Sequence, residues 1–254
     1  MAFAQAIFED CWPRWQQHFN PEVRLRLGGL PLSALADCTP ELARQYLNAD
    51  ESPQWSGFHL EKRRAEWLGG RLAAKWAASG FMGETAPEWR NLAIRNEEDG
   101  RPYITAGNCS VAPFVSISHS GPMAAALAAN LPCGLDLQEP GERIHRVKER
   151  FVAPKEADIL SGSLPPFTET QRLTLLWAAK EAVRKAVRIT PLLGLLEIRL
   201  LAGDGGRGTP QEPLALTFTS SREQAACPAH IPVLCFFADT LAWAMTCPPK
   251  ITKE

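Results

Sequence analysis

No apolar run in the 254-residue sequence reaches the about 20 residues that a membrane-spanning helix requires. The N-terminus does not predict a secretory signal either, because Glu9 and Asp10 interrupt its apolar residues and no basic segment precedes them. We therefore expect a cytoplasmic protein that does not associate with membranes.

Closely spaced cysteine pairs are also missing. The seven cysteines are scattered, and none of them forms a C-x-x-C motif: Cys11, Cys38, Cys109, Cys133, Cys227, Cys235 and Cys247. This spacing argues against a zinc site and against a disulfide framework, and it favours a reduced protein.

The chain has no excess of charge of either sign. Its 27 Lys and Arg residues nearly cancel its 28 Asp and Glu residues, which gives a formal net charge of −1. We therefore expect no nucleic-acid partner, and any anion-binding surface must be local. The hydrophobic content of 45% is enough for the core of one large domain or two small ones.

Hydrophobic spacing predicts a mixture of helices and strands that do not strictly alternate. Helices are predicted over 58–79, about 142–151, a short stretch from Pro154, and 169–188. Strands are predicted at 92–96 and 101–105 as a hairpin, then at 114–118, 123–130 and 134–137, with more after residue 190. Turns or loops are expected at Gly28–Gly29, 119–122 and 162–166. No tandem repeat is visible, and the mixture predicts an α+β fold.

The string GLDLQ, residues 134–138, offers two oxygen ligands on one face of a strand. Side chains two residues apart in a strand point the same way, so Asp136 and Gln138 share a face while Leu135 and Leu137 point to the core. A carboxylate beside an amide oxygen suits a hard cation. An ordinary edge strand with a solvated face explains the same pattern.

The string WAAKEAVRKA, residues 177–186, predicts a largely buried helix with one polar seam. Helical spacing places these side chains on the seam: Trp177, Glu181, Arg184, Lys185 and Arg188. One carboxylate among several cations suits a metal together with a polyanion. A surface Glu181–Lys185 pair, which contributes only about 0.3–0.5 kcal/mol, is the simpler alternative.

A third group of residues is cationic and lies upstream. It includes Lys62, Arg63, Arg64 and Arg71 on the early helix, Arg101 after the hairpin turn, and the pair Ser118–His119. Arginine is well suited to bind phosphate with two hydrogen bonds. A basic helix face is, however, usually only solvated.

Taken together, these motifs resemble those of a known family. GRP at 100–102, SISHS at 116–120, GLDLQ at 134–138 and WAAKEAVRK at 177–185 are similar, in order, to the motifs of Sfp-type 4′-phosphopantetheinyl transferases. KRRAEWLGGRLAA at 62–74 is similar to the N-terminal helix of the subgroup that serves siderophore synthesis. The resemblance covers about residues 58–190.

The resemblance implies two similar α+β halves in a pseudo-twofold arrangement, with coenzyme A in the cleft between them. The cut would fall near Leu131. Residues 1–130 would then contribute contacts to the phosphates of coenzyme A, and residues 131–254 would carry the metal site and the catalytic helix. The implied reaction is Mg²⁺-dependent transfer of the 4′-phosphopantetheine arm from coenzyme A to a serine of an apo-carrier protein, with release of 3′,5′-ADP.

The resemblance also assigns residues to roles. Asp136, Glu181 and Lys185 are the expected catalytic residues, and Asp136, Gln138 and Glu181 are the expected ligands of Mg²⁺, with Mn²⁺ as an alternative. The expected contacts to coenzyme A are Lys62, Arg63, Arg101, Ser118, His119 and Lys185. Gln138 departs from the family, which often has glutamate there, so the metal site has one charge less.

The expected partner is an acidic acyl or peptidyl carrier protein. Arg143, Arg146 and Arg150 follow the metal strand and could steer it to the site, although a solvated basic helix explains them equally well. We expect a monomer. Two alternatives stay open: a degenerate family member that binds coenzyme A or a carrier without transfer, and an unrelated metal-dependent phosphohydrolase.

Overall fold

The computed structural model describes residues 16, 19, 22–83, 88–105, 112–164, 166–204, 213–222, 228–238 and 240–248. Contacts between Cα atoms divide the chain into two compact units, with Arg24–Asn130 in the first and Leu131 onward in the second. Glu22 and Val23 group with the second unit. The division of roles between the two halves of the chain stays a prediction.

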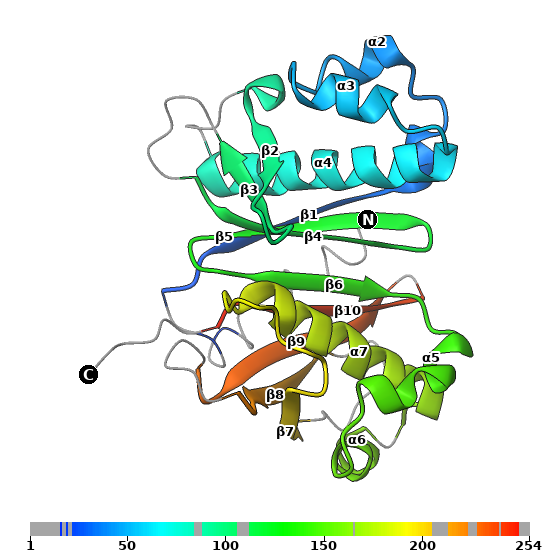
Figure 1. Cartoon of the computed structure of the whole chain (residues 1–254), viewed down its shortest axis with the longest axis vertical. Coiled ribbons are helices and arrows are strands. Elements are labelled where there is room, and N and C mark those ends of the chain that lie inside the picture. Colours follow the sequence, from blue (N-terminus) through cyan, green and yellow to red (C-terminus); the bar gives the residue numbers. More distant parts are fainter. Residues whose placement is uncertain are drawn as a thin grey trace. The chain divides into compact units, whose positions relative to one another are not determined.

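The first unit is an antiparallel sheet covered by one long helix (Figure 1). The sheet has the order β1 (Leu25–Pro31), β5 (Met123–Ala129) and β4 (Phe114–Ser120), and α4 (Glu61–Met82) packs on it. The hairpin of β2 (Ala93–Asn96) and β3 (Pro102–Thr105) lies beside it. The short helices of this unit are η2 (Leu32–Leu35), α2 (Pro40–Ala43), α3 (Glu51–Ser56) and η4 (Trp89–Asn91).

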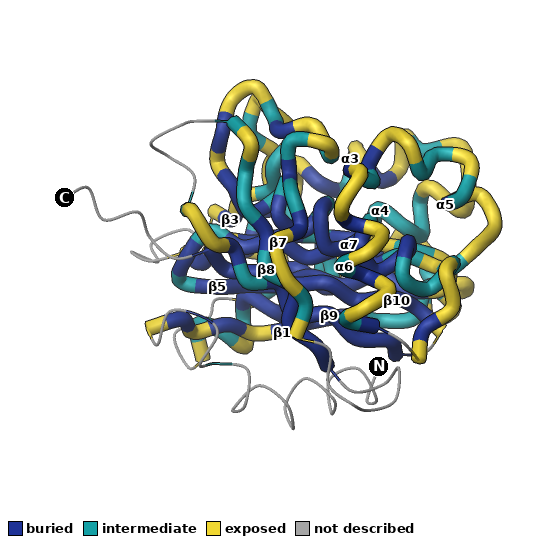
Figure 2. The backbone as a smooth tube through the Cα atoms, turned by 90° about the horizontal axis from the view of Figure 1, so that it is seen from below, coloured by how far each residue is buried: buried dark blue, intermediate teal, exposed yellow. Residues whose placement is uncertain are grey.

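The second unit is a five-stranded antiparallel sheet with one long helix on it. Its strand order is β6 (Gly134–Gln138), β10 (Leu241–Thr246), β9 (Ile231–Ala238), β8 (Leu214–Ser220) and β7 (Ile198–Asp204). Helix α7 (Glu169–Ala186) packs on β6, β10 and β9. The short helices are α5 (Arg143–Arg146), η5 (Lys148–Arg150) and α6 (Glu156–Ser163). Strands β5 and β10 are buried along their whole length (Figure 2).

The predicted α+β class is confirmed, whereas several local predictions were wrong. Gly28 and Gly29 lie inside β1 rather than in a turn, because a Cβ at Gly28 would collide with the backbone of Ala73 on α4. His119 and Ser120 extend β4, so the turn is confined to Gly121–Pro122. The expected helix over 142–151 is one α turn followed by a 3₁₀ turn, and α6 continues into the expected loop as far as Ser163.

A buried lysine holds α7 to its surroundings. The side chain of Lys180 is fully buried, and its Nζ donates to Glu156 Oε2 at 2.8 Å, to the Phe151 carbonyl at 2.6 Å and to the Leu195 carbonyl at 3.2 Å. Glu156 also accepts from the backbone N–H groups of Ala153 and Leu200, at 2.6 and 2.7 Å. Burial lowers the pKa of Lys180, and the bond to Glu156 opposes part of that effect.

The first unit contains an equivalent buried lysine–glutamate pair. Lys75 on α4 is fully buried and donates to Glu51 Oε2 and to the Tyr46 carbonyl, both at 2.6 Å. Glu51 accepts from the backbone N–H groups of Asn48 and Ile94. In both units the glutamate precedes its lysine by 24 residues and the carbonyl precedes it by 29. The structure thus reveals an internal correspondence where no repeat was visible in the sequence.

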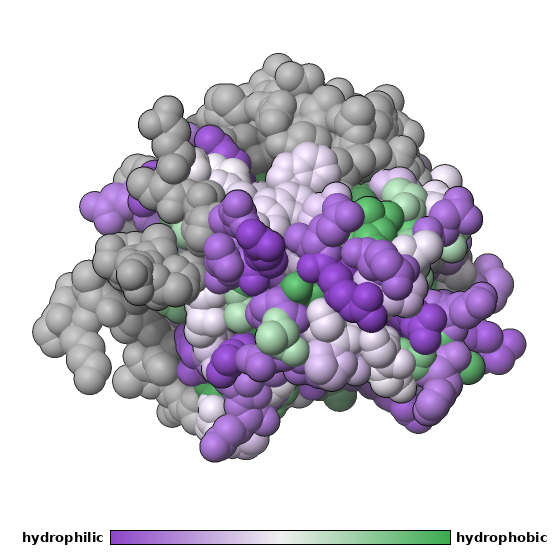
Figure 3. All heavy atoms as spheres, turned by 90° about the horizontal axis from the view of Figure 1, so that it is seen from above, coloured by the Kyte–Doolittle hydropathy of each residue, from purple (hydrophilic) through white to green (hydrophobic). Residues whose placement is uncertain are grey.

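The described part of the chain has no helix that is both long and apolar enough to cross a bilayer. Among the described residues on the face drawn in Figure 3, hydrophilic residues predominate and hydrophobic ones occupy a small area. Cytoplasmic location and a monomeric state stay predictions.

Replacing Lys180 with methionine should lower the free energy of unfolding by about 3–5 kcal/mol, because Glu156 would be left buried and unpaired. The matched control is Lys148→Met, which breaks a Lys–Glu pair of the same 2.8 Å length whose side chains are 38% and 56% exposed. That loss should stay below about 1 kcal/mol. Urea denaturation measures both values, and equal losses would contradict the central role given to the buried pair.

Candidate active site

Strand β6 and helix α7 approach each other closely at Gly134. A Cβ at this position would overlap the carbonyl oxygen of Ala182, so only glycine permits the observed packing. Helix α7 begins with a capping box, in which Thr168 and Gln171 satisfy each other's backbone N–H groups. The close approach of β6 to α7 and the start of α7 are therefore both fixed by local sequence.

The acidic residue of β6 faces this helix. Asp136 pairs across the ladder with Ala244 and Gln138 pairs with Ala242, in an unbroken register. Side chains directly opposite each other share a face of the sheet, and both alanines belong to the core cluster that contains α7. Asp136 and Gln138 therefore point to the α7 side, and Glu139 lies beyond the end of the strand.

Lys185 of α7 meets Asp136 directly. Its Nζ donates to Asp136 Oδ1 at 2.7 Å and to the Leu135 carbonyl at 2.9 Å. The side chains of Asp136 and Lys185 are 11% and 31% exposed, so the pair is largely screened from water yet still reachable from one side.

Glu181, one helical turn before Lys185, interacts electrostatically with both Asp136 and Lys185. Arg184 Nη1 lies 3.2 Å from Glu181 Oε1. Burial raises the pKa of the Glu181 carboxyl and the negative charge of Asp136 adds to this, while Arg184 and Lys185 oppose it. The structure thus gathers Asp136, Glu181 and Lys185 at one place, and their catalytic roles stay a prediction.

The donors at this place fit a hard divalent cation. Two carboxylates and one amide, all with oxygen as the ligand atom, suit Mg²⁺ better than Zn²⁺. Burial raises the pKa of Glu181, and the negative charge of Asp136 raises it further, so a cation between the two carboxylates would be favoured. Within the residues that the structure describes, three or more His, Cys, Asp or Glu side chains nowhere form a metal cluster. The side-chain amide of Gln138 lies 3.5 Å from the Glu139 carbonyl, and its role as a ligand stays a prediction.

Apart from Lys185, the predicted contacts to coenzyme A lie in the first unit. Glu66 of α4 lies between two of them, 3.8 Å from Lys62 Nζ and 3.8 Å from His119 Nδ1. The Lys62 side chain is 85% exposed, and Arg63 lies over the ring of Phe58. The hairpin brings Arg101 Nε within 3.1 Å of Asp99, and the Ser118 side chain is buried. The structure thus brings Lys62 and His119 together at Glu66.

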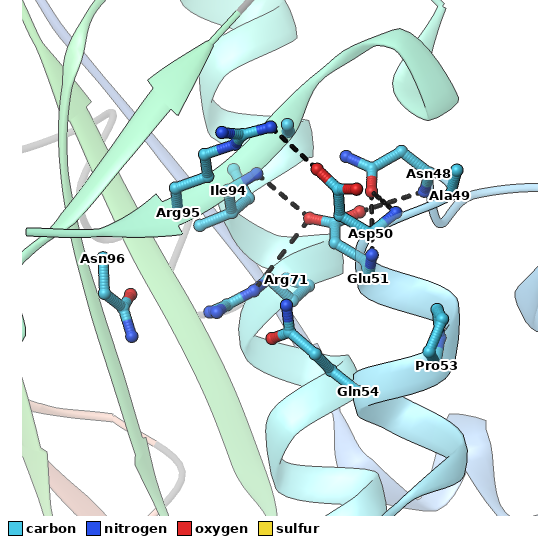
Figure 4. Close-up of a pocket in the computed structure, with 11 residues that line it drawn as sticks. Asn48, Ala49, Asp50, Glu51, Pro53, Gln54, Arg71, Ile94, Arg95 and Asn96 are labelled. Carbon is cyan, nitrogen blue, oxygen red and sulfur yellow. Dashed lines mark hydrogen bonds and ion pairs between the residues drawn. The ribbon is translucent and has the colours of Figure 1, made fainter.

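A polar cavity of about 630 Å³ opens elsewhere in the first unit (Figure 4). Its two arginines each face a carboxylate: Arg95 pairs with Asp50 at 2.7 Å, and Arg71 lies 4.0 Å from Glu51. Burial lowers the pKa of Arg71.

The predicted docking residues are accessible. Arg143, Arg146 and Arg150 are exposed, while Lys148 pairs with Glu169 at 2.8 Å. His145 contacts Thr170 at 2.9 Å and so connects α5 to the first turn of α7.

Sequence reasoning missed the residues that support the site. The sequence patterns gave no structural role to Lys180, which is fully buried in the core. Its partner Glu156 and the equivalent Glu51–Lys75 pair were also overlooked. The signal was present in the string Ala-Ala-Lys, which occurs at 73–75 and again at 178–180.

Strand β6 and helix α7 thus converge on two carboxylates and a lysine, a combination that suits a divalent cation together with phosphates. Comparison with known proteins identifies the superfamily. The family model of the 4′-phosphopantetheinyl transferase superfamily matches residues 132–234. The holo-(acyl-carrier-protein) synthase of Staphylococcus carnosus is 34% identical over 92 residues, which cover 35% of this chain and 77% of that protein.

Two further relatives extend this picture. The holo-(acyl-carrier-protein) synthase of Anoxybacillus flavithermus is 38% identical over 92 residues, 76% of its length. Enterobactin synthase component D of Escherichia coli K12 is 27% identical over 143 residues, 56% of this chain and 63% of that protein. A crystal structure of the Bacillus anthracis holo-(acyl-carrier-protein) synthase covers 41% of this chain and 92% of its own, with 23% identity and a TM-score of 0.38. The chain belongs to the 4′-phosphopantetheinyl transferase superfamily.

Glu181→Gln should stabilise the metal-free protein at pH 8. The pKa of Glu181 is raised on folding, so the unfolded state loses its proton at a lower pH than the folded state does. Stability therefore falls as pH rises above the ordinary glutamate value of about 4.3, and the penalty is complete once both states are ionised. Glutamine removes this penalty. Thermal unfolding in EDTA at pH 5 and pH 8 should show a gain for the variant that is larger at pH 8, and a loss at pH 8 would contradict this picture.

Proposed function

We propose that this chain transfers the 4′-phosphopantetheine arm of coenzyme A to a serine of an apo-carrier protein and releases 3′,5′-ADP. The observation that carries the proposal is the convergence of Asp136, Glu181 and Lys185 between β6 and α7, in a chain of this superfamily.

Glu181 is the group that takes the proton from the attacking serine. A carboxylate whose pKa is raised by burial holds a proton more firmly than an exposed one, and this makes it a better general base near neutral pH. The serine oxygen forms a bond to the phosphorus that bears the pantetheine arm, and the bond from that phosphorus to the bridging oxygen breaks. The displaced 3′,5′-ADP carries the electron pair away.

Asp136, Glu181 and Gln138 would hold Mg²⁺, with Mn²⁺ as the alternative. When bound, the cation neutralises charge that develops on the pyrophosphate. Lys185 now neutralises Asp136, and a cation there would free its ammonium group to bind a phosphate of coenzyme A. Positioning and charge neutralisation supply most of the catalysis in phosphoryl transfer.

The phosphates of coenzyme A would contact the basic surface of the first unit, made of Lys62, Arg63, Arg101, Ser118 and His119. Support comes from the exposed Lys62 and the half-exposed His119 beside it. The side chain of Arg101 is 10% exposed and would have to exchange Asp99 for a phosphate.

The carrier protein would dock on Arg143, Arg146 and Arg150, because carriers of this family are acidic and these three side chains are exposed.

The alternative is a degenerate family member that binds coenzyme A or a carrier without transfer, and only Gln138 favours it. Asp136, Glu181 and Lys185 are all present and close together, which argues for an active enzyme.

Asp136→Asn and Glu181→Gln should each lower transfer by about 100-fold or more, because each removes the negative charge of a cation ligand and the second also removes the base. The assay incubates the full chain with coenzyme A, Mg²⁺ and a panel of apo-carriers, and intact mass spectrometry detects the added arm. Asp158→Asn, an exposed acid on α6, is the control and should transfer normally. Near-normal turnover of either site variant at saturating Mg²⁺ would refute the assignment.

Arg101→Ala and His119→Ala should weaken the binding of coenzyme A by about tenfold, since a hydrogen bond to a charged group contributes roughly 1.5–3 kcal/mol. If these side chains bind the 3′-phosphate, 3′-dephospho-coenzyme A should lose much less. Arg90→Ala, whose side chain is 62% exposed, serves as the control. Calorimetric titration measures all affinities. Equal losses for both ligands would show that these side chains do not bind the 3′-phosphate.

Reversing Arg143, Arg146 and Arg150 to glutamate should raise the KM for an acidic carrier several-fold and leave the KM for coenzyme A unchanged. The effect should shrink as salt rises, because screening weakens attraction between exposed charges. Initial rates at low and high ionic strength provide the measurement. Unchanged carrier kinetics at low salt would show that the carrier docks elsewhere.

A further inference from the structure

Two cysteines that the reaction does not use face each other across the edge of the second sheet. The β6–β10 ladder ends with Gly134 opposite Thr246, so the next residues, Cys133 and Cys247, continue the same register. Both side chains are buried, with 4% and 0% of their residues exposed, and both are free thiols. The Cys133 thiol makes a side-chain hydrogen bond with the Cys247 thiol.

We propose that Cys133 and Cys247 form a reversible disulfide when the protein meets a peroxide. Neighbouring antiparallel strands hold opposed Cα atoms about 4.5–5.5 Å apart, which lies inside the range that a disulfide spans. The bond therefore requires rotation of the side chains and no rearrangement of the sheet.

The location of the pair separates it from the catalytic groups. Alternation along β6 and β10 puts the two thiols on the face of Leu135, Leu137, Trp243 and Met245, opposite to the face of Asp136 and Gln138. Cys235 is also buried, but it pairs with Ala244 on the α7 face and so points away from the other two thiols. Among the described cysteines, only Cys133 and Cys247 are opposed in this way.

The chemistry balances with hydrogen peroxide as the oxidant. One thiol sulfur attacks a peroxide oxygen, so that an S–O bond forms, the O–O bond breaks, and a sulfenic acid and one water result. The second sulfur attacks the sulfenic sulfur: the S–S bond forms, the S–O bond breaks, and a second water leaves with the proton of that thiol. The hydrogen bond with Cys247 and, after it, burial raise the pKa of Cys133, so oxidation should be slow and should follow local opening of the edge strand.

The experiment treats the reduced full-length chain with hydrogen peroxide, alkylates the remaining thiols in denaturant and maps the peptides by mass spectrometry. The wild type should yield a cross-linked peptide pair containing Cys133 and Cys247, lighter by two hydrogen atoms. Cys235→Ser should give the same pair, while Cys133→Ser and Cys247→Ser should not. The thermal midpoint of the oxidised wild type should rise by about 5–15 °C and return with dithiothreitol, because the bond closes a long loop.

Several results would overturn the proposal. These are complete alkylation of both cysteines after peroxide, sulfinic acid at either one, or a cross-link of either one to another cysteine. If the serine variants fail to fold, the peptide map of the wild type decides by itself. The peptide map does not depend on transferase activity, so a missing disulfide can be told apart from a failure of the proposed function.

Discussion

The buried pair of Lys180 and Glu156 is the interaction on which the candidate site depends. Lys180 ties α7 to Phe151, Glu156 and Leu195, and Glu156 in turn binds the backbone of β7 at Leu200. Glu181 is the next residue and lies about 100° further around the helix. Fixing Lys180 in the core therefore fixes the direction of Glu181, and Lys185 one turn later reaches Asp136. Gly134 lets β6 come close enough for this to happen.

The two units share this support but differ in what it carries. In the first unit the string Ala-Ala-Lys is followed by Trp76, which is 43% exposed, whereas in the second unit it is followed by Glu181. The buried lysine is thus followed by an apolar side chain in the first unit and by an acidic one in the second. A common framework with different residues at one position explains why the paired carboxylates occur in the second unit.

Patterns with a local cause were predictable from the sequence. The α+β class, the two long helices, the 92–105 hairpin and the shared face of Asp136 and Gln138 all follow from periodicity and turn residues. What failed depended on partners far away in the sequence. Lys180 looks like a surface cation until Glu156 is placed beside it, and Gly28 looks like a turn residue until Ala73 is found against it. The opposition of Cys133 and Cys247 follows from strand pairing that no local spacing reveals.

The proposed transfer requires a divalent cation held by residues of β6 and α7. Electron paramagnetic resonance of free and bound Mn²⁺, titrated into the full chain with coenzyme A present, tests this most directly because it detects the ion and not the reaction. The account predicts one bound Mn²⁺ per chain, displaced by Mg²⁺, with binding lost in Asp136→Asn and retained in Asp158→Asn. Equal Mn²⁺ binding by wild type and Asp136→Asn would contradict it.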